Sequence, residues 1–377
     1  MTVAYTEEHE AFRASLRAFL ARELTPHYRQ WEANHRPDRD FWRKAGAAGF
    51  LGMALPERYG GSGVDFLFHV IASQELGRCP GAETCGGLLQ TDMNAFHILN
   101  FGSDAQRDHW LPRMASGESL VAIAMTEPHS GSDVAGIRTT AIRDGEDYVL
   151  NGSKIYISIG LVADAVIIAA KTDPSLGAKG VSLFLVDMDL PGLKRGAPLI
   201  KMGMNGSDTI ELFFDDVRVP ADSLLGGEGQ GFAILMAELP RERLLVPVRA
   251  LEEAQRAFDL TVEFVKSRKA FGKHIIEFQN TQFVLAGLKT ELAAARAFTD
   301  KCIADAANGQ LSNTDSAMLK LHVTELQGRV VDACVQLHGG AGYMDEYDIC
   351  KLYTAARVTR IFGGTSEIMK LTIGRTL

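Results

Sequence analysis

Three glycine-rich loops are the first segments whose composition could serve chemistry, because glycines let a backbone approach a phosphate closely. They cover residues 60–63, 226–231 and 339–342. None spells G-x-G-x-x-G between a strand and a helix, and none spells G-x-x-x-x-G-K-[ST]. The sequence also lacks H-E-x-x-H and G-x-S-x-G. These absences exclude the commonest nucleotide-loop, zinc-enzyme and hydrolase motifs and leave open a helical and β scaffold without chemistry.

The cysteines offer no metal site. The chain has 5 of them, an odd number at irregular spacing, and no two form a C-x-x-C pair. Neither a zinc site nor a disulfide framework is expected from such a pattern. We expect buried thiols in a reducing, cytoplasmic compartment.

The bulk composition is that of a globular protein, with 46% hydrophobic and 23% charged residues. The net charge of -8 gives no electrostatic reason to coat nucleic acid or an anionic membrane. The N-terminus lacks the basic start and apolar stretch of a secretory signal. No run of about 18 apolar residues appears, so we expect no membrane span.

The secondary structure expected to position any site changes twice along the chain, from helical to β and back to helical. Up to about residue 120 the apolar residues follow helical spacing, as Phe12, Leu16, Phe19 and Leu20 do. From residue 121 short β-prone runs alternate with turns. A strand at 148–150, a turn at Asn151-Gly152 and a return strand at 154–158 form a predicted hairpin. Strands at this density predict an antiparallel barrel or sandwich of about 100 residues.

Long helical segments return after the glycine-rich junction at 226–231. They are expected at 233–239, 249–267, 279–307 and 312–337. Four such helices predict a four-helix bundle. The predicted fold is therefore α+β, with an N-terminal helical domain at 1–120, a β-domain at 121–227 and a C-terminal helical bundle at 228–377.

Five ordered segments of the sequence resemble motifs of the acyl-CoA dehydrogenase family. They are A-M-T-E-P-H-S-G-S-D at 124–133, N-G-S-K-I-Y-I-S at 151–158, R-K-A-F-G-K at 268–273, Q-L-H-G-G-A-G-Y at 336–343 and I-F-G-G-T-S-E at 361–367. They cover the chain from about residue 120 to its end. The resemblance implies a flavoprotein that binds FAD and dehydrogenates acyl-CoA thioesters.

The first two motifs imply contacts to the flavin ring. By the resemblance, Met125, Thr126 and Ser132 lie at its polar edge, where donors hold the ring and tune its electron affinity. Tyr156 would cover one flavin face, and the Ser158 hydroxyl would bond the nitrogen that receives hydride. Many members have Trp and Thr at these two positions. The alternative for Thr126 and Ser132 is local capping of a turn, and without the motifs a half-buried strand would be the better explanation for Tyr156 and Ser158.

The later motifs imply contacts to the rest of the cofactor. Arg268, Phe271 and Gln279 would come from a neighbouring subunit, and a guanidinium suits a pyrophosphate. This arrangement implies at least a dimer, and the family suggests a homotetramer. The alternative for Arg268 is a solvated charge at a helix end. The remaining implied cofactor residues are Gln336, Gly339, Gly340, Thr365 and Glu367.

The catalytic base is missing from its usual place. Many family members carry it in Tyr-Glu-Gly-Thr, whereas residues 362–365 here read Phe-Gly-Gly-Thr. The segment 238–245 resembles the minority arrangement of long-chain and isovaleryl-type members, in which a helix after the β-domain supplies the Glu. The resemblance therefore assigns Glu242 as the base. Because Gly363 has no side chain, it leaves space for the Glu242 carboxylate. Glu238, one turn earlier, is the competing carboxylate, and Glu242 as a plain surface residue is the alternative.

Further roles concern the substrate. The backbone N–H of Gly363 could donate to the thioester oxygen and stabilise a developing enolate. Ser132, Phe362 and Arg243 are the other expected substrate contacts. An ion pair is the alternative explanation for Arg243.

These assignments predict oxidation of acyl-CoA to trans-2-enoyl-CoA, with electrons passed to an electron-transferring flavoprotein. Two alternatives stay open. One is a catalytically silent subunit of a hetero-oligomeric dehydrogenase, motivated by the Glu missing at 363. The other is a flavin oxidase on the same scaffold. The sequence leaves open the acyl chain length and whether the carrier is CoA or an acyl carrier protein.

Overall fold

The computed structural model describes residues 3–85 and 87–377, except for the side chains of residues 87–91, 240 and 241. Its first part is helical, as predicted. The helices are α1 Glu7–Glu23, α2 Tyr28–Asn34, α3 Arg39–Ala47, α4 Phe66–Arg78, α5 Gly87–Phe101 and α6 Asp104–Ala115. Thr6 and His9 form a capping box at the start of α1, and Ser103 and Gln106 form one at the start of α6.

A mixed sheet follows. Its strands are β1 Val121–Ala124, β2 Thr140–Asp144, β3 Asp147–Ser158, β4 Ala165–Lys171, β5 Val181–Asp187, β6 Leu193–Arg195, β7 Thr209–Pro220 and β8 Leu224–Leu225. The order is β6-β7-β3-β2-β4-β5-β8, with β1 paired to β4. The prediction of a closed barrel is wrong, because the path from β6 to β8 stays open. The pairings of β4 with β1 and β2 are parallel, so a purely antiparallel sheet is wrong too.

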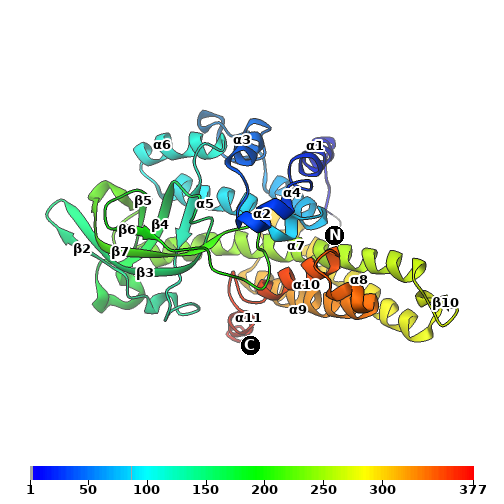
Figure 1. Cartoon of the computed structure of the whole chain (residues 1–377). Coiled ribbons are helices and arrows are strands. Elements are labelled where there is room, and N and C mark those ends of the chain that lie inside the picture. Colours follow the sequence, from blue (N-terminus) through cyan, green and yellow to red (C-terminus); the bar gives the residue numbers. More distant parts are fainter. Residues whose placement is uncertain (1–2, 86) are drawn as a thin grey trace.

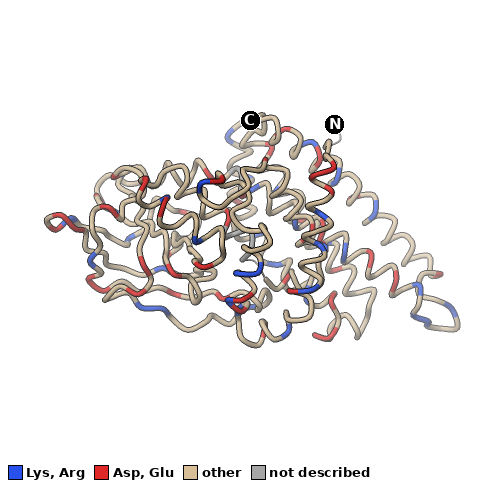
Figure 2. The backbone as a smooth tube through the Cα atoms, turned by 90° about the horizontal axis from the view of Figure 1, so that it is seen from above, with Lys and Arg blue, Asp and Glu red and all other residues tan. Residues whose placement is uncertain are grey.

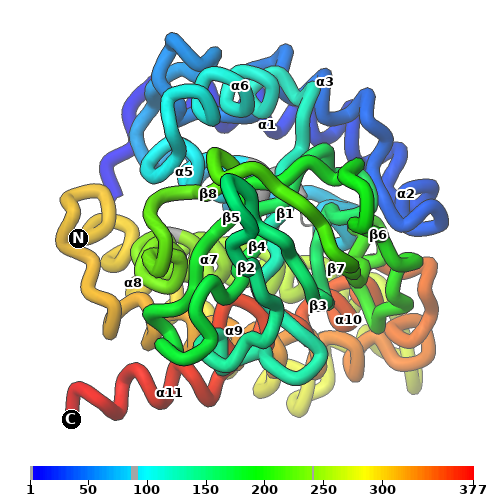
Figure 3. The backbone as a smooth tube through the Cα atoms, turned by 90° about the vertical axis from the view of Figure 1, so that its left-hand side faces the viewer, coloured from blue at the N-terminus to red at the C-terminus, as the bar shows by residue number. Residues whose placement is uncertain are grey.

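The sheet is sandwich-like because its two ends face each other across an apolar interior. The rings of Tyr148 on β3 and Phe184 on β5 meet edge to face at 5.0 Å, and both are buried. The opposite face of β4 and β5 packs against α5, α6 and the start of α7. Figures 1 and 3 show α3 and α6 above α7, and α9 and α11 below it.

The predicted hairpin at Asn151-Gly152 is wrong. Residues 147–158 form one continuous strand, β3, whose register against β7 shifts between Leu150 and Gly152. Gly152 has a φ of 144°, and the Asn151 side chain exchanges two 2.9 Å hydrogen bonds with Asp216. The Asn-Gly pair therefore builds a β-bulge, which uses the same tolerance for unusual φ that a turn would.

The C-terminal part is helical, as predicted, but its division differs. Its helices are α7 Gly231–Ser267, α8 Gln279–Ala307, α9 Asn313–His338, α10 Asp348–Thr359 and α11 Ser366–Gly374. The two helices expected at 233–239 and 249–267 are one 37-residue helix that continues past position 240. Packing of α7 against α4, α8 and α9 outweighs the hydrogen bond that a proline removes. In Figure 1, α7 runs from the sheet to a distant hairpin formed by β9 Lys269–Ala270 and β10 Lys273–His274.

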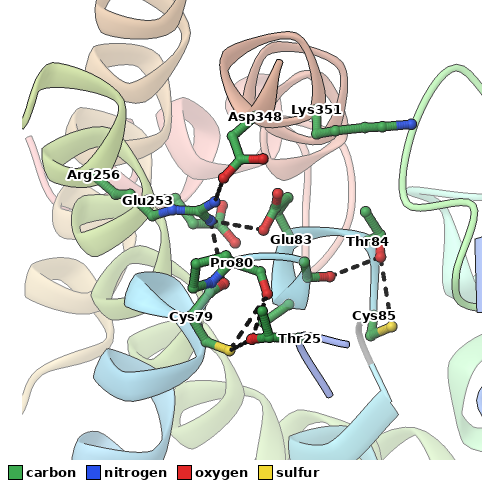
Figure 4. Close-up of polar contacts among 12 residues, drawn as sticks. Thr25, Cys79, Pro80, Glu83, Thr84, Cys85, Glu253, Arg256, Asp348 and Lys351 are labelled. Atoms are coloured by element: carbon green, nitrogen blue, oxygen red, sulfur yellow. Dashed lines mark hydrogen bonds and ion pairs between the residues drawn. The ribbon is translucent and has the colours of Figure 1, made fainter. Parts of the chain in front are cut away.

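Buried ion pairs hold the N-terminal helices to the bundle (Figure 4). The guanidinium of Arg256 on α7 donates to Glu83 at 2.8 Å, to Asp348 at 2.6 Å and to the Cys79 carbonyl at 3.2 Å. Arg249, two turns earlier, donates to the carbonyls of Ala82 and Cys85. Because Glu83 is only 1% exposed, Arg256 supplies the charge that its carboxylate needs.

Candidate functional site

Two carboxylates, Glu238 and Glu242, lie one turn apart on α7. Glu242 is half-buried, and its pKa is raised to about 7 by burial and, second, by the nearby charge of Glu238. Arg243 opposes this shift. The Glu238 carboxylate accepts a 2.8 Å hydrogen bond from Asn100 on α5. A carboxyl with a pKa near neutrality, such as that of Glu242, suits a general base. Glu238 differs from Glu242 because its carboxylate is already hydrogen-bonded to Asn100.

The turn at Gly363 and Gly364 lies against the same stretch of α7. A Cβ built on Gly363 would stand 4.0 Å from Cγ2 of Val246, which is one helical turn beyond Glu242. A Cβ built on Gly364 would stand 3.9 Å from Nη2 of Arg243. The two glycines have φ values of 62° and 94°, in the left-handed region. The structure therefore brings Gly363 to the helix segment that carries Glu242.

The neighbours of this turn are placed as follows. Arg243 donates to Asn313 Oδ1 at 3.1 Å, and burial lowers the pKa of its guanidinium. Phe362 is 38% exposed, so its ring is available to a ligand. Thr365 caps α11 through a 3.3 Å bond from the Ile368 N–H, and Glu367 follows in the first helical turn. Thr365 thus has a local structural role.

A buried lysine fixes the segment around Thr126. Lys154 on β3 is 0% exposed and donates to Glu127 at 2.8 Å and to the Met125 carbonyl at 3.0 Å. The Glu127 carboxylate also accepts the N–H groups of residues 138 and 139. The Thr126 carbonyl accepts the Ile155 N–H at 2.9 Å. Thr126 is therefore held directly beside β3.

Three further predicted flavin contacts lie on this segment and on β3. Tyr156 is 65% exposed with a φ of 61°, an unusual backbone conformation for a residue with a side chain. Ser158 is half-buried and pairs with Thr209 of β7. Ser132 is exposed in the turn after Ser130. An exposed aromatic ring in a strained strand is a surface on which a planar ligand could stack.

The other predicted cofactor residues gather at the far end of α7. Phe271 is 96% exposed in the β9–β10 hairpin, Arg268 precedes it, and Gln279 begins α8. The end of α9 joins them, because the His338 ring stacks on Phe264 of α7 at 4.3 Å. Figure 2 shows basic residues in this hairpin, which carries Arg268, Lys269 and Lys273.

The 336–340 segment leaves its backbone accessible. Gln336, Gly339 and Gly340 are exposed, and a Cβ built on either glycine would meet nothing within 4 Å. Gly339 has a φ of 59°. Accessible backbone beside a cluster of basic side chains fits a pyrophosphate.

Two groups of predicted cofactor residues therefore exist in one chain, and they are far apart. Glu242 on α7 and Arg268, directly after the last residue of α7, are 26 positions apart (268 − 242), which at 1.5 Å per residue is about 39 Å. A single dinucleotide cannot span that distance. The chain alone does not bring the two groups together.

Sequence reasoning missed one residue of the site, Lys320 on α9. It is 0% exposed and donates to the Gly364 carbonyl at 2.5 Å. A signal was available, because Lys320 occupies an apolar position in the helical repeat formed by Ala317, Leu319 and Val323. A lysine at such a position is rarely buried without a partner.

Two further features concern ligands and membranes. No cluster of three or more His, Cys, Asp or Glu side chains suited to a metal occurs among the described residues. Across residues 3–85 and 87–377, none of the helices combines the length and apolar character that crossing a bilayer requires.

Comparison with known proteins gives matches along nearly the whole chain. The acyl-CoA dehydrogenase N-terminal, middle and C-terminal domain models match residues 6–118, 122–217 and 229–377. A mitochondrial long-chain specific acyl-CoA dehydrogenase from Sus scrofa is 44% identical over 377 residues, covering 99% of this chain and 87% of that protein. A mitochondrial isovaleryl-CoA dehydrogenase from Oryza sativa subsp. japonica is 35% identical, with coverage of 100% and 92%.

A solved structure is also similar. The crystal structure of an acyl-CoA dehydrogenase from Geobacillus kaustophilus superimposes with a TM-score of 0.97 at 43% sequence identity. The match covers 100% of this chain and 99% of that one.

Proposed function

Because the chain belongs to the acyl-CoA dehydrogenase family, oxidoreductases that act on CH–CH groups with FAD, we propose that Glu242 is its catalytic base. The substrate would be an acyl-CoA thioester and the product trans-2-enoyl-CoA. The observation that carries this proposal is the contact of the Gly363 turn with α7. The position at which many family members carry the Glu is here Gly363. This glycine lies against the turn of α7 that follows Glu242.

The environment of Glu242 suits removal of an α-proton. A pKa of about 7 leaves a substantial fraction of the carboxylate ionised at neutral pH, yet keeps it more basic than an ordinary Glu. Closure of the site by a ligand would remove more water from this half-buried group and raise its basicity further. Glu238 is less suited because one of its carboxylate oxygens already accepts a hydrogen bond from Asn100.

The Gly363 turn would bind the thioester carbonyl. Its N–H requires no side chain and could donate to the oxygen on which negative charge develops as Glu242 takes the proton. Arg243 and Phe362, beside the same turn, would contact the substrate, and Ser132 would contact its CoA portion. The guanidinium of Arg243 lies beside the turn and bonds neutral Asn313, which favours a substrate contact over an internal ion pair.

The residues present fit FAD. The exposed Tyr156 ring, the hydroxyls of Thr126 and Ser158, and the backbone at Met125 would hold the flavin ring beside β3. Thr365 and Glu367, at the start of α11, would contribute from the turn after Gly363. When bound, FAD accepts the hydride that leaves the β-carbon of the substrate.

A second copy of the chain would complete the cofactor site. Arg268, Phe271, Gln279, Gln336, Gly339 and Gly340 form the group at the far end of α7. We propose that this group binds the pyrophosphate and adenosine of the FAD held by a neighbouring subunit, in a homotetramer. The separation of about 39 Å along α7 supports this arrangement. We also propose that an electron-transferring flavoprotein reoxidises the enzyme.

Anaerobic titration of the purified protein with acyl-CoAs tests the function. A panel from short to long and branched chains should bleach the flavin absorbance, and the chain length bleached fastest would identify the substrate class. Protein isolated without flavin would instead favour a catalytically silent subunit. Rapid oxygen consumption during turnover would favour a flavin oxidase.

A further inference from the structure

Lys320 is a buried ammonium in the wall of the proposed carbonyl site. It lies on α9, which packs against both α7 and α11, and is 0% exposed. Its Nζ donates to the Gly364 carbonyl at 2.5 Å, the one acceptor found for it among the described residues. Its Cε lies 3.9 Å from where a Cβ of Gly363 would stand. The ammonium therefore binds the carbonyl of the same turn whose Gly363 N–H is proposed to bind the thioester.

Packing alone does not explain a lysine here. Burying an ammonium costs several kcal/mol, whereas a methionine would fill a similar volume without that cost. The charged groups nearby do not offset it well. Arg243 repels the ammonium and Glu325 attracts it, but Glu325 already bonds Arg360 at 3.3 Å and Ser366 at 2.6 Å. Burial lowers the pKa of Lys320 to about 8, so at neutral pH it remains mostly protonated and able to donate.

The turn that Lys320 contacts needs such a constraint. Gly363 and Gly364 both have positive φ, a conformation that glycine leaves and enters at little steric cost. A flexible turn would present its N–H at varying distances from the substrate oxygen, and oxyanion stabilisation depends on a fixed donor. A charge-assisted hydrogen bond from Lys320 to the Gly364 carbonyl fixes the turn through its backbone.

We propose that Lys320 is a positioning residue that holds the Gly363–Gly364 turn in the conformation that binds the thioester carbonyl. It touches neither substrate nor cofactor and acts through the backbone of the turn. This inference rests on the proposed function, because it assigns Lys320 to the same carbonyl site. Replacing Lys320 should therefore impair stabilisation of the enolate rather than folding or CoA binding.

The test uses flavin-loaded protein and acetoacetyl-CoA. The α-proton of this ligand lies between two carbonyls, so the bound ligand ionises without losing hydride, and its enolate is followed by ultraviolet absorbance against pH. In Lys320→Met the apparent pKa of the bound ligand should rise by about 1 unit, a tenfold loss of enolate stabilisation. With substrate, kcat should fall about 10-fold to 100-fold, below the 10²–10³ typical of losing a direct oxyanion donor, while KM changes little.

Two further variants separate positioning from stability. Lys320→Gln retains a shorter, neutral donor, and its pKa for the bound ligand should lie between those of wild type and Lys320→Met. Lys351→Met removes another buried lysine, which lies on α10 and pairs with Glu32 and Asp345, and should leave the enolate pKa unchanged even where thermal stability falls. Enolate pKa values in both Lys320 variants equal to that of wild type would overturn the inference.

The outcome for wild-type protein distinguishes this inference from the function on which it rests. Wild-type protein that neither forms the enolate nor is bleached by acyl-CoA would overturn both. Wild-type protein that does both, with Lys320 variants that behave identically, would overturn the role of Lys320 alone.

Discussion

Gly363 lies against Val246 of α7, with 4.0 Å between Val246 Cγ2 and the position a Cβ of Gly363 would take. Since Val246 is one turn beyond Glu242, a side chain at 363 and the carboxylate at 242 would enter the site from two neighbouring elements. The space at Gly363 permits ordinary van der Waals contact, while its φ of 62° disfavours any residue other than glycine. Under the proposed function, the two positions are alternative sites for the catalytic carboxylate.

Moving the catalytic carboxylate from position 242 to position 363 should restore part of the activity that the loss of Glu242 removes. Glu242→Gly should be nearly inactive, and adding Gly363→Glu should raise kcat at least about tenfold, since a positioned base contributes 10²–10⁴. The strained backbone should cost about 1–3 kcal/mol of stability. Steady-state kinetics and thermal unfolding measure both effects. The matched control is Gly363→Gln in the same background, and equal activity with Gln would show that the carboxylate is irrelevant.

The pH profile should reveal the repulsion between Glu238 and Glu242. Because burial and Glu238 raise the pKa of Glu242 to about 7, kcat/KM should increase with pH through that value. Glu238→Gln removes the like charge, so the pKa should fall and the acidic limb should move to lower pH. Glu263→Gln, at an exposed position further along α7, should leave the profile unmoved. An acidic limb that stays in place in Glu238→Gln would contradict this account.

The same pKa has a consequence for stability. The folded protein holds the Glu242 proton up to about pH 7, whereas the unfolded chain releases it near 4.5. The contribution of Glu242 to the free energy of unfolding is therefore fully present below pH 4.5 and is lost as the pH rises through 7.

Mixing two inactive variants should restore activity if FAD is shared between subunits. Glu242→Gln and Arg268→Ala should each be inactive alone. After dissociation and reassembly in equal amounts, roughly a quarter of the sites should be intact, because half of the dimers are mixed and each has one unaltered site. Activity that stays at background, with assembly verified by native mass spectrometry, would place both residues in one subunit's site.

Removing Arg256 should destabilise the protein far more than removing an exposed arginine. Arg256→Met leaves the buried Glu83 carboxylate without its cation, which costs about 3–5 kcal/mol. Arg218→Met, which breaks exposed pairs with Asp144 and Asp147, should cost at most about 1 kcal/mol. Thermal unfolding of the two variants compares them directly. Similar unfolding midpoints would mean that the buried network contributes little net stability.

Much of the fold follows from local patterns in the sequence. The segment expected at 279–307 is helix α8 to the residue, and α9 differs by one residue at each end, because both have long uninterrupted helical periodicity. The hairpin at Asn151-Gly152 failed because a bulge and a turn use the same residues. The choice between them depends on β7, more than 50 residues away.

The site could be predicted only where motifs carried it. The pairing of Glu242 with Gly363 came from comparing two motifs, and the structure adds that Gly363 lies against Val246, one helical turn beyond Glu242. The helical repeat could mark Lys320 as a buried lysine, but its role could not be assigned from the sequence, because its partner is a backbone carbonyl that only the tertiary fold brings near. Contacts of this kind leave no pattern in residue type at the acceptor position.

The most direct test of Glu242 as the base is anaerobic mixing of flavin-loaded Glu242→Gln with the acyl-CoA that bleaches wild type fastest. The variant keeps the shape of the side chain but cannot accept the α-proton. It should bind FAD and acyl-CoA like wild type, yet its flavin absorbance should remain oxidised, with bleaching slowed at least 10²-fold. Bleaching of Glu242→Gln at the wild-type rate would contradict the account.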